Sequence, residues 1–101
     1  MKPPKRKNVD VVVAEKVRND NFRLIGHATD AMRKRHVLMP EVEDVLLSGH
    51  HNPAQDEWSE SYQTWRYAIE GWTEDGRDLR LAVSFDQTDD VVVITVITPH
   101  T

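Results

Sequence analysis

The sequence predicts an α+β domain in which two or three N-terminal helices pack on one face of a three- to four-stranded antiparallel sheet. The first half of the chain has the spacing of amphipathic helices, whereas the second half alternates apolar and polar residues as half-buried strands do. Helices followed by a run of strands are typical of this fold class. The chain has 101 residues, which suits one hydrophobic core, so we expect a single domain over residues 9–101.

The first predicted helix covers residues 9–20. It places Val9, Val13 and Val17 on one side, although its β-branched run is also compatible with a strand. Residues 22–26 follow it and are expected to form a short extended connector.

The second and third predicted helices cover residues 27–36 and 40–49. The third has Pro40 at a first helical position and Gly49 at its end, where both residue types are favoured. In the second, winding the chain at about 100° per residue places Arg35 within an apolar stripe. A guanidinium there needs a carboxylate, a carbonyl oxygen or a bound phosphate as its partner.

Three segments of the second half are predicted as strands: residues 62–72, 78–86 and 91–98. Residues 51–58 form a weaker fourth candidate. A turn at Asp75 and Gly76 pairs Glu70 with Arg80 across the first two strands. The polar face of this pair then carries a set of small or charged side chains: Thr64, Arg66, Ala68, Arg80, Ala82 and Ser84. This face is either a shallow binding surface or the solvated side of the sheet.

The basic residues are concentrated at the start of the chain. Residues 1–36 have ten Lys and Arg against four Asp and Glu, whereas residues 37–101 have three against thirteen. We expect residues 1–8 to form a disordered basic tail, which serves as a solubilising terminus or contacts nucleic acid. Because the remaining body is acidic, any contact with RNA needs a local basic patch.

Composition and spacing exclude several classes of site. The chain has no cysteine, so disulfides and thiolate metal sites are ruled out. No apolar run is long enough to span a bilayer and no secretory signal is found, so we expect a cytoplasmic protein with no membrane contact. His50 and His51 are adjacent, and an extended chain points them to opposite faces, so no metal site is predicted. There is no Gly-rich phosphate loop or nucleophile elbow, and no cofactor is expected.

The order of several short motifs resembles the bacterial domain-of-unknown-function family 4258, over residues 15–98. The positions that carry the resemblance are His27 and Ala28 at a helix start, Met32 and Arg35 near its end, Gly49, Arg66 and Tyr67 in a strand, Gly71, the turn Asp75-Gly76-Arg77, and Thr95. This chain has Ala31 where a basic residue is often found and His36 where glycine is common. The family is grouped with the barnase, colicin and RelE-like toxin folds. The resemblance therefore implies a relative of ribonuclease toxins, many of which pair with an antitoxin.

The activity that the resemblance implies is RNA cleavage without a metal. This reaction needs a base near the 2′-hydroxyl, a cation for the charge on the phosphorane and an acid for the leaving oxygen. We nominate His27 as the base, Arg35 and Arg66 as phosphate stabilisers, and His100 as the acid. For substrate binding we nominate Arg33, Lys34, Tyr67 and Arg80. The expected partners are RNA and an antitoxin protein.

Each nominated residue has a structural alternative. His27 can serve only as a cap at the helix start, and Arg66 can serve only the solvated face of the sheet. The stem of Arg35 can pack on Met32 while its head bonds to carbonyl oxygens. Two functions therefore stay open: a RelE- or barnase-like ribonuclease toxin or an inactive relative of one, and a non-enzymatic module that binds a protein through the sheet face or an edge strand.

Overall fold

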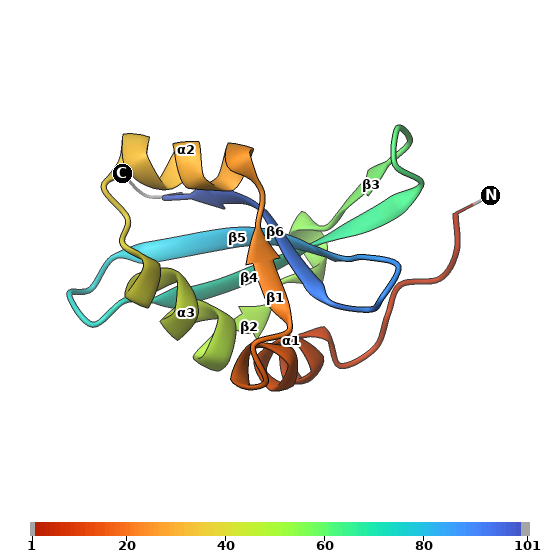
Figure 1. Cartoon of the computed structure of the whole chain (residues 1–101), viewed down its shortest axis with the longest axis horizontal. Coiled ribbons are helices and arrows are strands. Elements are labelled where there is room, and N and C mark those ends of the chain that lie inside the picture. Colours follow the sequence, from red (N-terminus) through yellow and green to blue (C-terminus); the bar gives the residue numbers. More distant parts are fainter. Residues whose placement is uncertain (1, 100–101) are drawn as a thin grey trace.

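In a computed structural model the chain forms an α+β fold, and the structure describes residues 2–99 (Figure 1). Its elements are α1 (Val9–Arg18), β1 (Phe22–Leu24), α2 (Gly26–Arg35), α3 (Met39–Ser48), β2 (His50–His51), the 3₁₀ turn η1 (Pro53–Gln55), β3 (Glu57–Ser59), β4 (Thr64–Trp72), β5 (Asp78–Phe85) and β6 (Val91–Ile97). The predicted class is confirmed, and three helices pack on a sheet. None of the described helices is long and apolar enough to cross a membrane.

The sheet differs from the prediction because it has six strands and is mixed. Its order is β1-β6-β5-β4-β2, and β3 pairs with the first residues of β4. The expected connector contains β1, which pairs in parallel with β6 from Phe22 opposite Val91 to Leu24 opposite Val93. Three residues are too few to show a strand period in the sequence. The single weak strand expected at residues 51–58 is two short strands separated by η1, since proline interrupts a ladder.

The β4–β5 hairpin has the predicted register. Glu70 lies opposite Arg80, and Trp72 lies opposite Asp78. The side chains of one face are fully buried beneath the helices and form the core: Ile69, Leu79, Leu81, Val83, Val91, Val93 and Val96. We call this the closed face of the sheet, and the other side the open face. The alternation of β4 and β5 therefore assigns every second residue to the core, as their sequences predict.

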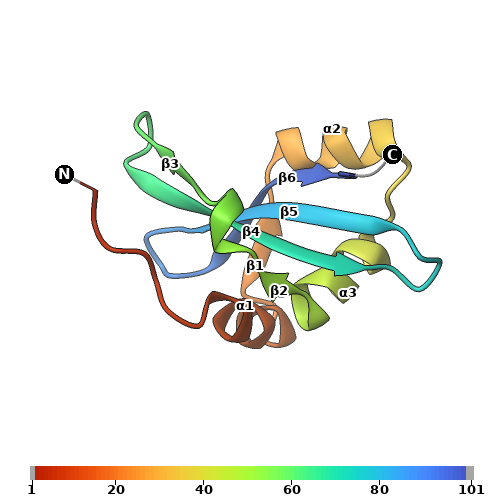
Figure 2. The same cartoon turned by 180° about the vertical axis from the view of Figure 1, so that it is seen from behind.

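Helices α1 and α3 lie side by side and cover the closed face (Figures 1 and 2). From α1, Val9, Val13 and Val17 are buried in the core, as the helical spacing predicts. At the end of α3, a side chain on Gly49 would place its Cβ 2.7 Å from the Glu70 carbonyl oxygen, so α3 meets β4 at a distance that only glycine permits.

Helix α2 lies along β6, beyond the three residues that pair with β1 (Figure 1). Arg35 Nε donates to the carbonyl oxygen of Val96 at 3.0 Å, which satisfies an acceptor on the outer edge of the sheet. His36 directly follows the last residue of the helix, Arg35, and its φ of 55° is left-handed. Glycine is the residue most favoured in this conformation, and this chain has a histidine there. The Arg77 guanidinium holds this end by donating to the carbonyl oxygens of Arg35 and His36 at 2.8 and 2.7 Å.

The N-terminal segment, expected as a disordered tail, lies against the sheet from residue 3 onward. Trp65 Nε1 donates to the carbonyl oxygen of Pro3, and Arg6 N donates to the Tyr67 hydroxyl, both at 2.8 Å. Two cations of this segment pair with carboxylates far away in the sequence, Lys5 with Asp56 and Arg6 with Asp89. Composition alone does not reveal such partners.

Candidate functional site

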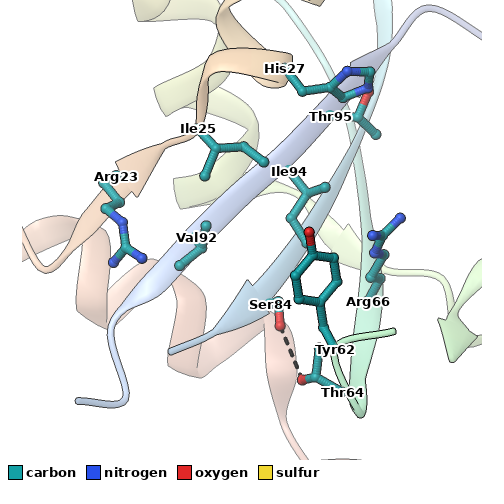
Figure 3. A pocket seen from close by; sticks show the side chains of 10 residues that line it. All are labelled: Arg23, Ile25, His27, Tyr62, Thr64, Arg66, Ser84, Val92, Ile94 and Thr95. Carbon is teal, nitrogen blue, oxygen red and sulfur yellow. Dashed lines mark hydrogen bonds between the residues drawn. The ribbon is translucent and has the colours of Figure 1, made fainter. Parts of the chain in front are cut away.

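A pocket of about 600 Å³ opens on the open face of the sheet (Figure 3). It lies between the start of α2, the middle of β6 and the turn that joins β3 to β4. Its walls are formed by Arg23, Ile25, His27, Tyr62, Thr64, Arg66, Ser84, Val92, Ile94 and Thr95. A cavity of this size accommodates a small-molecule or nucleotide-sized ligand.

A β-bulge in β6 shapes the floor of the pocket. Ala82 lies opposite Thr95, but the next residue of β5, Val83, lies opposite Val93, so β6 carries an extra residue, Ile94. Strict alternation would send Thr95 into the core. With the bulge, Ile94 and Thr95 both line the pocket, while Val96 stays buried on the closed face. The second apolar side of β6 therefore lines the pocket, and no further layer of the described structure covers it.

Arg66 is the pocket residue whose side chain most clearly lacks a hydrogen-bond acceptor. Its Nε is buried and has no hydrogen-bond partner, and none of the described carboxylates forms an ion pair with this guanidinium. A buried N–H group without a partner is costly, and a guanidinium stays charged when it is buried. In the described structure no hydrogen bond or ion pair occupies the Arg66 guanidinium, so the pocket wall carries an unpaired cation to which an anionic ligand would supply acceptors.

The other arginine of the pocket wall is already neutralised. Arg23 hydrogen-bonds to Asp86, the turn residue between β5 and β6. Hydrogen bonds from Thr88 and Arg23 hold the pKa of Asp86 well below its usual range, so this carboxylate stays charged. The contrast with Arg66 shows that the positive charge of the pocket is concentrated at one side chain.

His27 and Tyr62 complete the mouth of the pocket. His27 is the second residue of α2, and Figure 3 shows its imidazole above Thr95. Tyr62, in the turn after β3, has 76% of its surface exposed and lies between Ile94 and Arg66 in the same view. At the base, Thr64 Oγ1 and Ser84 Oγ are 3.2 Å apart and share a hydrogen bond. The pocket thus combines an imidazole, an aromatic ring, a guanidinium and hydroxyl groups.

A smaller hollow of about 90 Å³ continues along the open face from the pocket. Arg66 and Thr95 line both cavities, and the small side chains of Ala68 and Ala82 form part of the second. Arg80 also lines it, but its Nε donates to Glu70 Oε2 at 2.6 Å. Burial raises the pKa of Glu70, but hydrogen bonds from Arg80 and Asn52 outweigh this, so its pKa lies below the usual value. Arg80 is therefore paired with a carboxylate, whereas Arg66 is not.

A comparison with protein families identifies residues 24–98 as a match to the family "Domain of unknown function (DUF4258)". The chain belongs to this family. No curated protein and no solved structure matches the chain. The DUF4258 match confirms the resemblance found in the sequence.

The DUF4258 structure brings together two of the four residues nominated for catalysis. His27 and Arg66 line the same pocket. Arg35 is not among the lining residues, because its head bonds to the Val96 carbonyl oxygen, one of the partners that the sequence argument allowed for. His100 lies outside the described residues.

The residues nominated for substrate binding lie outside the main pocket of this DUF4258 chain. Arg33 and Lys34 are exposed on α2, and Arg33 forms an ion pair with Asp30 at 3.3 Å. Tyr67 is 5% exposed and belongs to the core cluster of the closed face, where its hydroxyl accepts from Arg6. Adjacent strand residues face opposite sides, so Tyr67 is absent from the wall of the main pocket, although it borders the smaller hollow together with Arg66. Arg80 lines only the smaller hollow.

Sequence reasoning missed Tyr62 and Ile94 as pocket residues. The alternating pattern places Tyr62 in a strand, but the residue precedes β4 in a polar stretch that forms the turn after β3. Ile94 reaches the pocket only through the bulge, and no turn residue or glycine marks that bulge in the sequence. Among the described residues, no three of His, Asp and Glu are arranged to hold a metal ion.

Proposed function

We propose that this domain is a metal-independent endoribonuclease of the RelE- or barnase-like type, acting as the toxin of a toxin–antitoxin pair, and that RNA binds in the pocket on the open face. The proposal rests above all on Arg66, whose guanidinium has no partner among the described residues and which lines the pocket together with His27. A phosphodiester supplies the anionic acceptors that a guanidinium binds best.

In the proposed reaction, His27 acts as general base and Arg66 as phosphate stabiliser. His27 accepts the proton of a 2′-hydroxyl, whose oxygen attacks the adjacent phosphorus. The P–O5′ bond breaks, and the 5′-oxygen leaves with a proton from a general acid, the role assigned to His100. Arg66 donates to the phosphoryl oxygens, where negative charge grows in the transition state. The products are a 2′,3′-cyclic phosphate and a 5′-hydroxyl.

Tyr62 and the hydroxyl groups of the pocket suit a nucleotide. An exposed aromatic ring next to a cation is the usual arrangement for stacking a base beside its phosphate. Thr95 and Thr64 place hydroxyl groups on the pocket wall, where they can bond to the sugar or the base edge. These features favour a single-stranded segment, whose bases are free to leave the stack.

The alternative is a protein-interaction module that uses the sheet face or an edge strand. The outer strands of the described sheet are short: β1 and β3 have three residues each and β2 has two. Short edges offer few backbone groups to an added strand, so edge pairing is disfavoured. A protein bound on the open face would have to supply a carboxylate to Arg66, which makes Arg66 decisive for both functions.

The test is cleavage of a fluorescently labelled single-stranded RNA by the purified chain in the presence of EDTA. The wild type should produce fragments that end in a 2′,3′-cyclic phosphate, and expression of the chain in cells should arrest growth. We expect His27→Ala to lower the cleavage rate by roughly 10² to 10⁴, the usual contribution of a general base, and to relieve the arrest.

The matched control is His50→Ala, which removes a 69% exposed histidine side chain outside the pocket and should leave cleavage unchanged. Full activity of His27→Ala would remove His27 from the mechanism. Normal growth with abundant wild-type protein, together with intact RNA in the purified assay, would contradict the ribonuclease proposal.

A further inference from the structure

The N-terminal segment is bonded directly to β4. We call residues 3–6 the strap. Trp65 Nε1 donates to the carbonyl oxygen of Pro3, and the backbone N–H of Arg6 donates to the hydroxyl of Tyr67, each at 2.8 Å. Both donor–acceptor pairs fix the backbone of the strap on side chains of a single strand.

The middle of the strap is fixed by a buried carboxylate. Lys5 Nζ lies 3.1 Å from Asp56 Oδ2 and donates to the carbonyl oxygen of Pro53 at 3.2 Å. The Asp56 side chain is fully buried and also accepts from the backbone N–H of Ala68, at 2.9 Å, and pairs with His51 Nε2, at 2.8 Å. A buried carboxylate needs such partners, so the ammonium group of Lys5 belongs to the structure of the η1–β4 junction.

The end of the strap is fixed by Arg6. Its guanidinium donates to Asp89 with Nη2 at 2.8 Å from Oδ2, and lies 4.1 Å from the ring centre of Phe85. The hydrogen bond from Arg6 lowers the pKa of Asp89 below its usual value. The strap thus joins β4 to the turn between β5 and β6.

The position of the strap relative to the pocket follows from the alternation of β4. Trp65 and Tyr67 point to the side of the strap, whereas Thr64 and Arg66 point into the pocket on the other side. Figures 1 and 2 show β3 and the first part of β4 extending beyond the rest of the sheet, with the N-terminal segment along the same end. The wall of the pocket is therefore a projecting hairpin, supported from behind by the strap.

We propose that residues 3–6 are positioning residues that hold the β3–β4 hairpin so that Arg66 and Tyr62 form the wall of the pocket before a ligand arrives. This inference rests on the proposed function for its effect on RNA, but its effect on the hairpin does not depend on that function. Lys5 and Arg6 pair inside the molecule with Asp56 and Asp89, so the proposal assigns these two cations to the hairpin and not to an RNA contact. Pre-forming a site lowers the entropy that binding must overcome.

The test compares Lys5→Ala with Lys7→Ala by amide hydrogen exchange. Both variants lose one positive charge, but Lys7 is exposed and, in the described part of the chain, has no hydrogen bond or ion pair. In Lys5→Ala the amides of residues 57–66 should exchange about tenfold faster, as expected for the loss of one charge-assisted hydrogen bond, with residues 79–96 unchanged. Trp65→Phe removes the N–H donor to Pro3 and keeps an aromatic ring, and it should also increase the exchange rates of residues 57–66.

A second measurement connects the strap to binding. The affinity of an eight-nucleotide single-stranded RNA with methylated 2′-hydroxyls, which the proposed reaction cannot cleave, should fall in Lys5→Ala and stay unchanged in Lys7→Ala. Lys5→Arg, which keeps the cation, should retain most of this affinity. Unchanged rates of amide exchange at residues 57–66 in both Lys5→Ala and Trp65→Phe would overturn the inference. An equal increase of the exchange rates in all strands would overturn it too. If the wild type binds no RNA, the proposed function fails, while the exchange experiment still decides whether the strap holds the hairpin.

Discussion

On the closed face of β4 and β5, side chains such as Ile69, Leu81 and Val83 have no exposed surface. On the open face of the same strands, Ala68, Ala82 and Arg66 line hollows that reach solvent. The two faces belong to the same strands. The buried side chains that stabilise the fold lie on the closed face, and Arg66, whose Nε has no hydrogen-bond partner, lies on the open face. Substitutions on the open face should therefore change binding with little effect on folding, and substitutions on the closed face should do the reverse.

Arg35 and Arg66 are both nominated from the sequence as phosphate stabilisers, but the structure gives them different roles. Arg35 donates to the Val96 carbonyl oxygen and closes the edge of the sheet beside α2. Arg66 Nε is buried and has no partner. One guanidinium therefore contributes to stability, and the other costs stability unless a ligand is bound.

The largest expected effect separates the two faces directly. Val83→Asp places a carboxylate in the core and should cost several kcal/mol against a total stability of about 5–15 kcal/mol, so the variant should be largely unfolded. Ala82→Asp, one residue earlier, places the same group on the open face between Arg66 and Arg80 and should remain folded. Chemical denaturation monitored by circular dichroism measures both, and equal losses in the two variants would show that the assignment of the faces is wrong.

The next effect concerns the edge of the sheet. Arg35→Met keeps much of the packing on α2 and removes the hydrogen bond to Val96, which should lower the free energy of unfolding by about 1 kcal/mol. The residue is exposed, so water can reach the carbonyl oxygen and limits the loss. Binding at the pocket should be unchanged. A loss of RNA affinity without a loss of stability would return Arg35 to the functional site.

A smaller effect is expected for the ion pair on the open face. Arg80→Ala removes the partner of Glu70 and should lower stability at pH 7 by roughly 0.2–1 kcal/mol. The pKa of Glu70 is lowered in the folded state, so this contribution is present above the unfolded pKa, about 4.3, and is lost as the pH falls through the lowered value. Urea unfolding at pH 7 and at about pH 2 should show the two proteins differing at the higher pH and converging at the lower one. A constant difference would mean that the pair contributes nothing.

The sequence predicts the helices and strands that have a clear apolar spacing. It does not predict which segments far apart in the sequence contact each other. The three helices and the β4–β5 register follow from apolar spacing and from the Asp75-Gly76 turn, which are local signals. The parallel pairing of β1 with β6 joins segments that lie far apart in the sequence, and so does the ion pair of Lys5 with Asp56 that holds the strap. Local patterns carry no information on such contacts. The expectation of a disordered tail rests on composition, which does not show where a charged segment finds its partners.

The candidate site follows from the sequence only in part. His27 and Arg66, both nominated from the sequence, line one pocket, because the start of α2 and the start of β4 border the same stretch of the open face. Arg35 is nominated for the same site, but its head bonds to the edge of the sheet. Tyr62 and Ile94 are missed, since a turn and a bulge place them in the pocket and neither has a local sequence signal.

The most direct test compares Arg66→Met with Arg35→Met by calorimetric titration of a short single-stranded RNA whose 2′-hydroxyls are methylated, so that the proposed reaction cannot cleave it, alongside the free energy of unfolding of each variant. Arg66→Met should fold with wild-type or slightly higher stability, because it removes a buried donor without a partner, and should bind RNA about 10- to 100-fold more weakly. Arg35→Met should show wild-type affinity and lower stability. Unchanged RNA affinity in Arg66→Met, or a loss of stability larger than that of Arg35→Met, would contradict the claim that Arg66 is held unpaired for a ligand.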